Sequence, residues 1–276
     1  LAEVEAIRAF RMAEVASTTY QLAALMTRNG AKLFPVDTRR RAFVSFFLRV
    51  GRRLYSFLRN ARKVSEKKIE NISFPELRDG QLPPPVAFET RQEPEVSIVI
   101  PVHNQLAFTA QCLESIAKSR NNVSFEVIVV DDKSSDLTSK YLRTCSGVRQ
   151  VNNSENLGYL RSTNRGAELA SAPFIVLLNN DTTVSDGWLD ELIATFNRYP
   201  DTGIVGASLI YPDGRLQEAG GIIFTDGTGW NYGRLQDPED EIFSFVREVD
   251  YCSAACIAVR KKMWEQIGGF DERFAP

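Results

Sequence analysis

Three short polar clusters in this sequence each follow a continuous apolar run. The apolar runs are VSIVIP, FEVIVV and PFIVLL, and the clusters that follow them are His103-Asn104, Asp131-Asp132 and Asn179-Asn180-Asp181. Short apolar runs of this kind are typical of strands buried in a parallel sheet. Because the ligands of such sheets bind at the carboxyl ends of the strands, we expect the three clusters to share one ligand-binding rim.

The carboxylates in these clusters admit two interpretations. Asp131 and Asp132 can accept hydrogen bonds from a nucleoside base or ribose, although on their own they fit a helix cap and a turn better. The Asp181 carboxylate is a hard oxygen ligand that suits Mg²⁺ or Mn²⁺, ions that bind through one or two carboxylates and substrate phosphates. On its own, Asn179-Asn180-Asp181 is also a common turn. We expect His103 to make a structural hydrogen bond.

Helices are predicted between these strands. Helical segments are expected at 108–119, at 135–145 with Ser134 or Ser135 as its cap, from Gly158 to about Ala170, and at 186–199. This alternation predicts an α/β domain over 96–276 with a mostly parallel central sheet and flanking helices. After Pro200, strands are expected at 203–211, 215–217 and 251–259, with a turn at 212–214 and a helix at 261–267.

Two regions precede this domain. Residues 1–70 are predicted to be a helical N-terminal segment, and residues 71–95 hold five of the twelve prolines and predict an extended linker. Residues 39–68 carry a net charge of +10, whereas 1–38 are neutral and 69–276 carry −12. Phenylalanines form an apolar stripe along this basic helix. The pattern favours packing on a neighbouring domain or partner helix, and the alternative is peripheral contact with an anionic membrane surface.

Composition excludes several classes of protein. The chain has 276 residues, of which 43% are hydrophobic and 25% charged, which is ordinary for a globular protein and unlike a disordered chain. It contains no stretch of about 18 apolar residues that would span a membrane. Four cysteines without a C-x-x-C spacing argue against a disulfide scaffold or zinc ribbon and favour a cytoplasmic location. No nucleic-acid-binding motif accompanies the basic helix, so nucleic acid is not an expected partner.

The order of the motifs is more specific than any one of them. The blocks VSIVIPVHN, FEVIVVDDKSSD, NLGYLRSTNRG, FIVLLNNDTTV and IGGFDERF, between Val96 and Pro276, resemble the family 2 glycosyltransferases. The resemblance implies the Rossmann-like GT-A fold. It also implies inverting, metal-dependent transfer of a sugar from a UDP- or dTDP-sugar to a hydroxyl of a glycan or lipid-linked acceptor. The implied setting is synthesis of a bacterial surface polysaccharide at the inner face of the cytoplasmic membrane.

The resemblance also assigns residues. The donor nucleotide would be bound by Pro101, His103, Asn104, Asp131, Asp132, Gly158, Asn164, Asn179 and Asn180, and Mn²⁺ or Mg²⁺ by Asp181. The family usually has Tyr where this chain has His103, and commonly has Asp where this chain has Asn179. We expect the loss of that carboxylate to weaken metal affinity, because the number of charged ligands sets the strength of hard-cation sites.

The acceptor side is less well defined by the sequence. In the family, the general base is the Asp of a Glu-Asp motif a few residues after the GGFDERF block, and this chain ends at Pro276 before it. No catalytic base is therefore assigned, and residues 1–276 are expected to bind donor but transfer sugar poorly. Asp213, Glu218 and Asp271 are weaker acceptor-side candidates.

Two other function classes stay open at this point. One is a non-catalytic module that binds sugar nucleotides and carries a helical arm for docking to a membrane or partner. The other is a nucleotidyltransferase, which is disfavoured because the VHNQLAF segment after the first strand lacks a glycine-rich basic loop.

Overall fold

The structure is a computed structural model that describes residues 80–275. The helices predicted within residues 1–70, including the basic helix at 39–68, lie outside the described residues. The first part of the linker predicted at 71–95 lies outside them as well.

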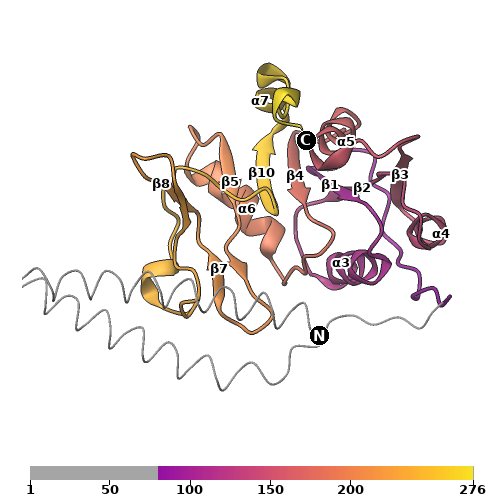
Figure 1. Cartoon of the computed structure of the whole chain (residues 1–276), viewed down its shortest axis with the longest axis horizontal. Coiled ribbons are helices and arrows are strands. Elements are labelled where there is room, and N and C mark those ends of the chain that lie inside the picture. The colour runs from indigo at the N-terminus through magenta and orange to yellow at the C-terminus, as the bar shows by residue number, and fades with distance from the viewer. Residues whose placement is uncertain (1–79, 276) are drawn as a thin grey trace, which may run out of the picture. The chain divides into compact units, whose positions relative to one another are not determined.

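A six-stranded sheet forms the centre of the domain (Figure 1). Its strands in spatial order are β3 (Val148–Asn152), β2 (Phe125–Asp131), β1 (Val96–Val102), β4 (Phe174–Leu178), β10 (Cys256–Arg260) and β5 (Ile204–Gly206). The first four run parallel to one another, and β10 runs antiparallel to both β4 and β5. The mostly parallel α/β architecture predicted from the sequence is confirmed.

Helices cover both faces of this sheet (Figure 1). The hydrophobic core on one face includes side chains of α3 (Leu106–Lys118), α4 (Thr138–Leu142) and α6 (Trp188–Arg198). The core on the other face includes side chains of α5 (Gly158–Glu168) and α7 (Lys261–Ile267). Ile98 and Ile100 of β1 belong to the first core and Val99 to the second. Because both faces are covered, the central strands are apolar without alternation.

Helix α5 packs unusually close to the sheet. A Cβ atom on Gly166 would lie 2.4 Å from Cγ1 of Val99 and 2.9 Å from Cγ2 of Val130, which leaves no room for any side chain. This close approach of α5 to β1 and β2 fixes the height of the helix above the sheet, and with it the position of its first turn.

Part of the predicted linker packs against the domain. Ala87 forms a parallel bridge with Ser146, and the N–H of Phe88 donates to the Ser146 carbonyl at 3.0 Å. The Phe88 ring meets Phe125 edge-on with its centroid 6.3 Å away. This segment is extended, as its prolines predict, but its apolar side chains join the first core.

The first half of the domain differs from prediction in two places. The edge strand β3 was not predicted, because its sequence VRQVN is half exposed and lacks an apolar run. Helix α4 is shorter than the predicted 135–145, and the prediction that Ser134 or Ser135 caps it is wrong. Asp136 provides the contact instead, since its Oδ1 accepts from the Thr138 N–H at 2.9 Å.

The second half is built from very short strands. The predicted strand 203–211 is split into β5 and β6 (Leu209–Ile210), and β6 pairs with β7 (Leu216–Glu218) around the predicted turn. A further hairpin, β8 (Gly221–Ile223) with β9 (Gly229–Asn231), was not predicted. The predicted strand 251–259 begins only at Cys256. Strands of two or three residues carry too little periodicity to be read from sequence. Single turns of 3₁₀ helix occur at Glu241–Phe243 and Glu272–Phe274.

Candidate functional site

The carboxyl ends of β1, β2 and β4 lie at one edge of the sheet and bring the polar clusters together. Val102, which follows the buried Pro101, pairs in register with Asp131, and the Asp132 N–H donates to the Val102 carbonyl at 2.8 Å. His103 Nδ1 donates to the main-chain oxygen of Asp132 at 2.7 Å. We call this edge, from His103 to Asp181, the rim.

The Asp132 carboxylate caps helix α5. Its Oδ1 accepts from the Leu157 N–H at 2.8 Å and from Asn153 Nδ2 at 2.7 Å, and its Oδ2 accepts from the Gly158 N–H at 2.8 Å. The start of a helix is a favourable place for an anion, and here a buried carboxylate of the chain itself occupies that place. Asp132 therefore positions α5 at the rim.

Asp131 and Asn104 organise the loop that follows β2. Asp131 Oδ1 accepts from the Ser134 N–H at 2.9 Å, and the Asn104 side-chain oxygen accepts from the Ser135 N–H at 2.7 Å. Asn104 Nδ2 lies 3.1 Å from His103 Nε2, which fits a neutral imidazole that donates through Nδ1 and accepts through Nε2. The structural hydrogen bond expected of His103 is confirmed.

The end of β4 holds an exposed acid of the rim. Asp181 is exposed, and no hydrogen bond or ion pair holds its carboxylate among the described residues. Asn180 Nδ2 donates to Thr109 Oγ1 at 2.9 Å. The side-chain oxygen of Asn179 is buried and has no hydrogen-bond partner within residues 80–275. Buried polar atoms without a partner are rare in folded proteins and call for an explanation such as a bound ion.

The donor set at this end of β4 fits a hard divalent cation. Both Asp181 and Asn179 offer oxygen ligands, as Mg²⁺ and Mn²⁺ prefer. Among residues 80–275 there is no group of three or more His, Cys, Asp or Glu side chains that could hold a metal by themselves. The protein ligands would thus be few, and most of the coordination would fall to phosphate oxygens and water.

Tyr159, in the first turn of α5, is a rim residue that sequence reasoning missed. Its hydroxyl donates to the Ala254 carbonyl at 2.9 Å, although the two residues are 95 positions apart. Burial of the hydroxyl, with a smaller contribution from the negative charge of Asp181, raises the pKa of Tyr159 to about 12. The tyrosine therefore stays neutral at physiological pH and lies within electrostatic reach of Asp181.

Asn164, predicted to line the nucleotide pocket, is engaged elsewhere in the structure. Its Nδ2 donates to the Phe270 carbonyl at 2.9 Å, and its Oδ1 accepts from the Phe270 N–H at 2.9 Å. A Cβ atom on Gly269 would lie only 2.7 Å from that Oδ1. Asn164 thus joins α5 to the GGF segment that follows α7.

Two of the three acceptor-side candidates are occupied by local contacts. Asp213 lies in the β6–β7 turn and pairs with Arg215, whose Nε donates to Oδ2 at 2.7 Å. Asp271 caps the 3₁₀ turn that follows it and pairs with Arg273 at 2.5 Å. The hydrogen bonds from Arg273 lower the pKa of Asp271. Both carboxylates thus stabilise turns.

Glu218, the third acceptor-side candidate, is a buried carboxylate at the end of β7. Its side chain accepts a hydrogen bond from the Ser253 N–H at 3.1 Å. Burial raises the pKa of Glu218, and the Ser253 hydrogen bond only partly offsets that effect. The carboxyl group is therefore easier to protonate than an exposed glutamate.

Residues 253–255 connect this second half to the rim. The Ser253 N–H binds Glu218, the Ala254 carbonyl accepts from Tyr159, and the Ala255 carbonyl accepts from the Asn179 N–H at 2.9 Å. Three consecutive residues thereby hold β7, α5 and the end of β4 at fixed positions. The sequence offered no signal for this link, because each contact joins residues far apart in the chain.

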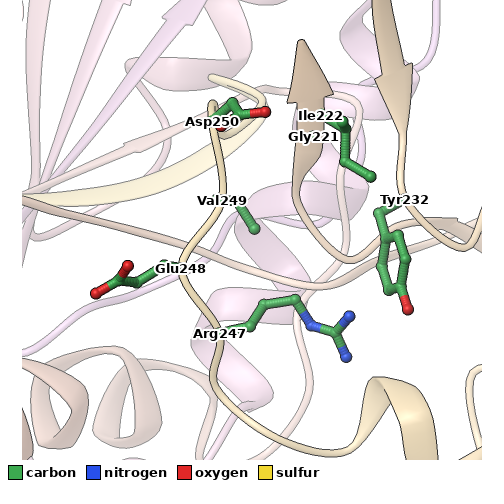
Figure 2. Close-up of a pocket in the computed structure, with 7 residues that line it drawn as sticks. All are labelled: Gly221, Ile222, Tyr232, Arg247, Glu248, Val249 and Asp250. Atoms are coloured by element: carbon green, nitrogen blue, oxygen red, sulfur yellow. The ribbon is translucent and has the colours of Figure 1, made fainter. Parts of the chain in front are cut away.

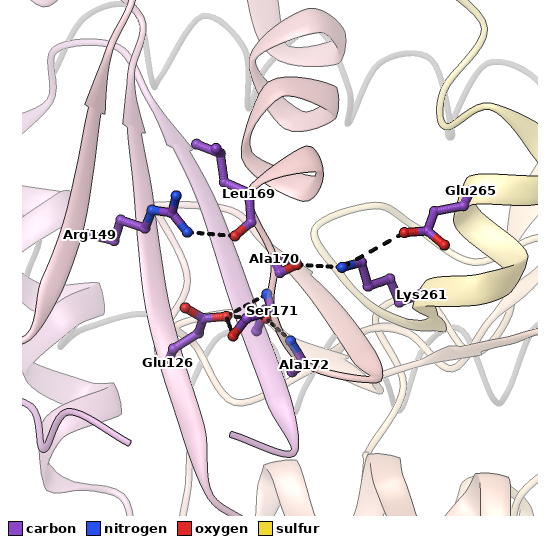
Figure 3. A network of polar contacts seen from close by, with 9 residues as sticks. Glu126, Arg149, Leu169, Ala170, Ser171, Ala172, Lys261 and Glu265 are labelled. Carbon is purple, nitrogen blue, oxygen red and sulfur yellow. Dashed lines mark hydrogen bonds and ion pairs between the residues drawn. The ribbon is translucent and has the colours of Figure 1, made fainter. Parts of the chain in front are cut away.

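Two other polar regions lie away from the rim. A small open pocket on the β8–β9 hairpin is lined by Gly221, Ile222, Tyr232, Arg247, Glu248, Val249 and Asp250 (Figure 2). The network in Figure 3 lies at the opposite edge of the sheet, where Glu126 accepts from the Ser171 hydroxyl at 2.7 Å and Lys261 donates to the Ala170 carbonyl at 2.7 Å. Burial raises the pKa of Glu126, but hydrogen bonds from Ser97 and Ser171 outweigh it and leave the pKa lowered. This network joins the start of β2 and the start of α7 to residues 170–171, which precede β4.

Among the described residues, no helix combines the length and the apolar character that crossing a bilayer requires.

Comparison with known proteins places the chain in a family. Residues 97–268 match the model of glycosyl transferase family 2. The O-antigen biosynthesis protein RfbC of Myxococcus xanthus is 31% identical over 200 residues, which cover 68% of this chain and 16% of that protein. An N-acetylglucosaminyl-diphospho-decaprenol L-rhamnosyltransferase of Mycobacterium tuberculosis is 28% identical over 171 residues, 54% of this chain and 56% of that protein.

A solved structure of a mannosyltransferase from Pyrobaculum calidifontis, in complex with GDP-Man and Mn²⁺, aligns with 78% of this chain and 55% of its own length. The TM-score is 0.45 and the sequence identity 16%. The chain spans little more than half of the mycobacterial relative and much less of the myxobacterial one. With the family model matched over most of the α/β domain, the chain belongs to glycosyl transferase family 2.

Proposed function

We propose that this chain carries the donor-binding domain of an inverting, metal-dependent glycosyltransferase that uses a UDP- or dTDP-sugar. The observation that carries the proposal is the end of β4, where an exposed carboxylate without a protein partner among the described residues stands next to a buried, unpartnered amide oxygen. In a family 2 chain, this is where a cation and a diphosphate would meet the protein.

Asp181 and Asn179 would hold the cation. A bound Mn²⁺ or Mg²⁺ supplies positive charge that stabilises the negative charge developing on the departing diphosphate. The neutral Tyr159 hydroxyl and residues 253–255 keep the β4 end in place, so that the protein ligands need little reorganisation when the donor binds.

Asp131 is the better of the two neighbouring acids for contacting the nucleoside. Its carboxylate accepts one hydrogen bond from the described residues, at Oδ1, and so retains acceptor capacity for a base N–H or a ribose hydroxyl. Asp132 already accepts three hydrogen bonds and serves to position α5. His103 and Asn104 form the neighbouring wall of the rim.

The names of the relatives guide the proposal for substrates. An O-antigen biosynthesis protein and a rhamnosyltransferase that acts on a diphospho-decaprenol acceptor support a role in making a bacterial surface polysaccharide. We propose a glycan or lipid-linked hydroxyl as the acceptor, with residues 39–68 as a peripheral contact at the inner face of the cytoplasmic membrane.

Calorimetric titration of UDP, dTDP and GDP, each with Mn²⁺, Mg²⁺ or EDTA, tests the proposal. We expect one pyrimidine nucleotide to bind best, and to bind only when a divalent cation is present. Absence of binding by all three nucleotides, or equal binding in EDTA, would contradict the proposal. Metal-dependent binding without any sugar transfer to acceptors would favour a non-catalytic sugar-nucleotide-binding module.

A further inference from the structure

The β8–β9 hairpin presents an open aromatic face. Ile222 of β8 pairs directly with Trp230 of β9, so both side chains project from the same face of the hairpin. Phe224 and Tyr232 each lie two residues further along the chain and continue the alternation on that face. Trp230 is 57% exposed and Phe224 is 49% exposed. An exposed apolar patch, unlike a single exposed side chain, marks an interaction site.

The other face of the hairpin is covered at Gly221. A Cβ atom on Gly221 would lie 2.1 Å from the ring of Tyr251, and the Tyr251 hydroxyl donates to Asn231 at 2.7 Å. The tyrosine therefore packs flat against the glycine side of the hairpin. The hairpin is therefore held at its Gly221–Asn231 end, while its aromatic face remains open.

Arg247 extends the aromatic face toward the next loop. Its guanidinium lies 4.3 Å from the ring centroid of Tyr232 and 4.5 Å from that of Phe245, which is 60% exposed. It also donates to the Ile242 carbonyl, which fixes its position. Figure 2 shows the arginine reaching toward Tyr232, with Ile222 beside that ring and the Glu248 carboxylate turned away. We call the combined surface the aromatic strip; it comprises Ile222, Phe224, Trp230, Tyr232, Phe245 and Arg247.

The charge around the aromatic strip limits what it can bind. Residues 221–250 contain seven acidic residues and two arginines, a net charge of −5. An anionic lipid surface or a nucleotide diphosphate would be repelled by this charge. A neutral, polyhydroxylated ligand is not repelled. Its hydroxyls can also donate to the surrounding carboxylates and accept from Arg247.

A short segment of chain connects the hairpin of the strip to the rim. Its hairpin is joined at Gly221 to Asp250 and Tyr251 by main-chain hydrogen bonds. Ala255, five residues after Asp250, binds the Asn179 N–H at the end of β4. Five residues of extended chain span no more than about 18 Å. A ligand of a few sugar units could therefore reach from the base of the hairpin, at Asp250, to the rim.

We propose that the aromatic strip binds the neutral saccharide portion of the acceptor. The apolar faces of sugar rings stack on Trp230, Phe224 and Phe245, while hydroxyls bind Arg247 and the neighbouring acids. The aromatic rings offer large contact area with little loss of side-chain freedom, as suits a glycan-binding surface. The assignment to the acceptor rests on the proposed transferase function, whereas binding of saccharide by the strip does not.

Binding of the 276-residue chain to an array of neutral and acidic oligosaccharides tests the proposal, with phosphatidylglycerol vesicles as a second probe. We expect the aromatic strip to bind neutral oligosaccharides and not to bind the vesicles. Trp230→Ala and Phe245→Ala should each weaken saccharide binding by about tenfold or more. Tyr199→Ala, which removes an exposed aromatic ring outside the strip, should leave it unchanged.

Two controls separate the possible failures. Because both substituted rings are largely exposed, the melting temperature of each variant should stay within about 2 °C of the parent. Titration of UDP with Mn²⁺ should be unaffected by all three substitutions. The proposal is overturned if no neutral oligosaccharide binds, if binding survives Trp230→Ala and Phe245→Ala, or if both of these variants lose vesicle binding instead. If the chain binds saccharide but not nucleotide, the proposed transferase function is contradicted, whereas the proposal that the strip binds saccharide stands.

Discussion

Two stretches of the same domain expose their apolar side chains very differently. Across Val96–Arg198, all of which the structure describes, Tyr159 is the one large apolar side chain that is exposed, and its hydroxyl is engaged at the rim. Across the 43 residues 204–246, nine large apolar side chains are exposed. The first stretch folds around its own cores, whereas the second presents apolar surface outward.

Particular carboxylates in the two stretches differ in how many hydrogen bonds they accept. In the first stretch, Asp132 at the rim and Asn164 further along α5 are engaged by hydrogen bonds to the chain, and Asp181 stands out because it is not. In the second stretch, Glu218 is buried with a single hydrogen-bond donor identified for its carboxylate, the Ser253 N–H. The comparison separates side chains whose hydrogen bonds stabilise the structure from side chains that are free to contact a ligand.

The largest effect on folding is expected from Asp132→Ala. The change removes one of the two acceptors of the buried Asn153 amide nitrogen and the carboxylate that accepts from the first N–H groups of α5, and should lower the free energy of unfolding by about 3 kcal/mol. Urea unfolding measures this. Asp226→Ala, which removes a local hydrogen bond from an exposed turn of the second stretch, should change the midpoint little. Equal effects of the two changes would erase the contrast between the stretches.

A smaller effect is expected from Gly166→Ala. The added methyl group meets Val99 and Val130 and forces α5 away from the sheet, at a cost of about 2 kcal/mol. The first turn of α5 lies at the rim, where Asp132 holds it. Displacing the helix should therefore disturb the rim and lower nucleotide affinity as well. Gly187→Ala offers a contrast, because its Cβ atom would meet no neighbour and only the positive φ of 73° is strained. Urea unfolding and nucleotide titration of both variants check the prediction.

Glu218→Gln should change the pH dependence of stability. Burial raises the pKa of Glu218 in the folded chain, so ionisation costs the folded state more than the unfolded state. The parent therefore loses stability as pH rises from the unfolded value of about 4.3 through the higher folded value. The glutamine cannot ionise, so the variant should gain melting temperature relative to the parent at pH 8 and lose that advantage at pH 4. A pH-independent difference would show that Glu218 ionises in the folded chain as readily as in the unfolded one.

The smallest effect is expected from Asp271→Asn. The carboxylate is exposed and pairs with Arg273 within one turn, and such surface pairs contribute little to stability. Both melting temperature and metal-dependent nucleotide binding should match those of the parent. A loss of sugar transfer with binding intact would show that Asp271 acts on the acceptor after all.

The sequence predicted those parts of the molecule whose signal is local. Buried strands such as β1 and β4 are continuous apolar runs, and α7 was predicted at its observed bounds. The β8–β9 hairpin was missed, because three-residue strands show no periodicity and the Tyr251 that seals the hairpin is distant in sequence.

Roles that depend on distant partners could not be predicted in the same way. Asp132 was placed correctly at a strand end, but its carboxylate caps a helix that begins 26 residues later. Asn164 meets Phe270 across 106 residues, and Tyr159 meets Ala254 across 95. Residue type and spacing indicated which side chains reach the rim, while the fold alone determines which of them already have partners.

The central claim is that Asp181 is the rim carboxylate left to bind a metal–nucleotide complex. Its most direct test is the affinity for Mn²⁺ in the presence of UDP, measured by electron paramagnetic resonance, in the parent, in Asp181→Asn and in Asp186→Asn. Asp186 is a matched control, since it is also exposed and lies on the same loop but is paired with Arg120. We predict that Asp181→Asn weakens Mn²⁺ binding by roughly 10- to 100-fold or more, because loss of a residue that merely supports a metal ligand already costs that much. Asp186→Asn should leave Mn²⁺ binding unchanged. Equal Mn²⁺ affinity in the parent and in Asp181→Asn would contradict the account.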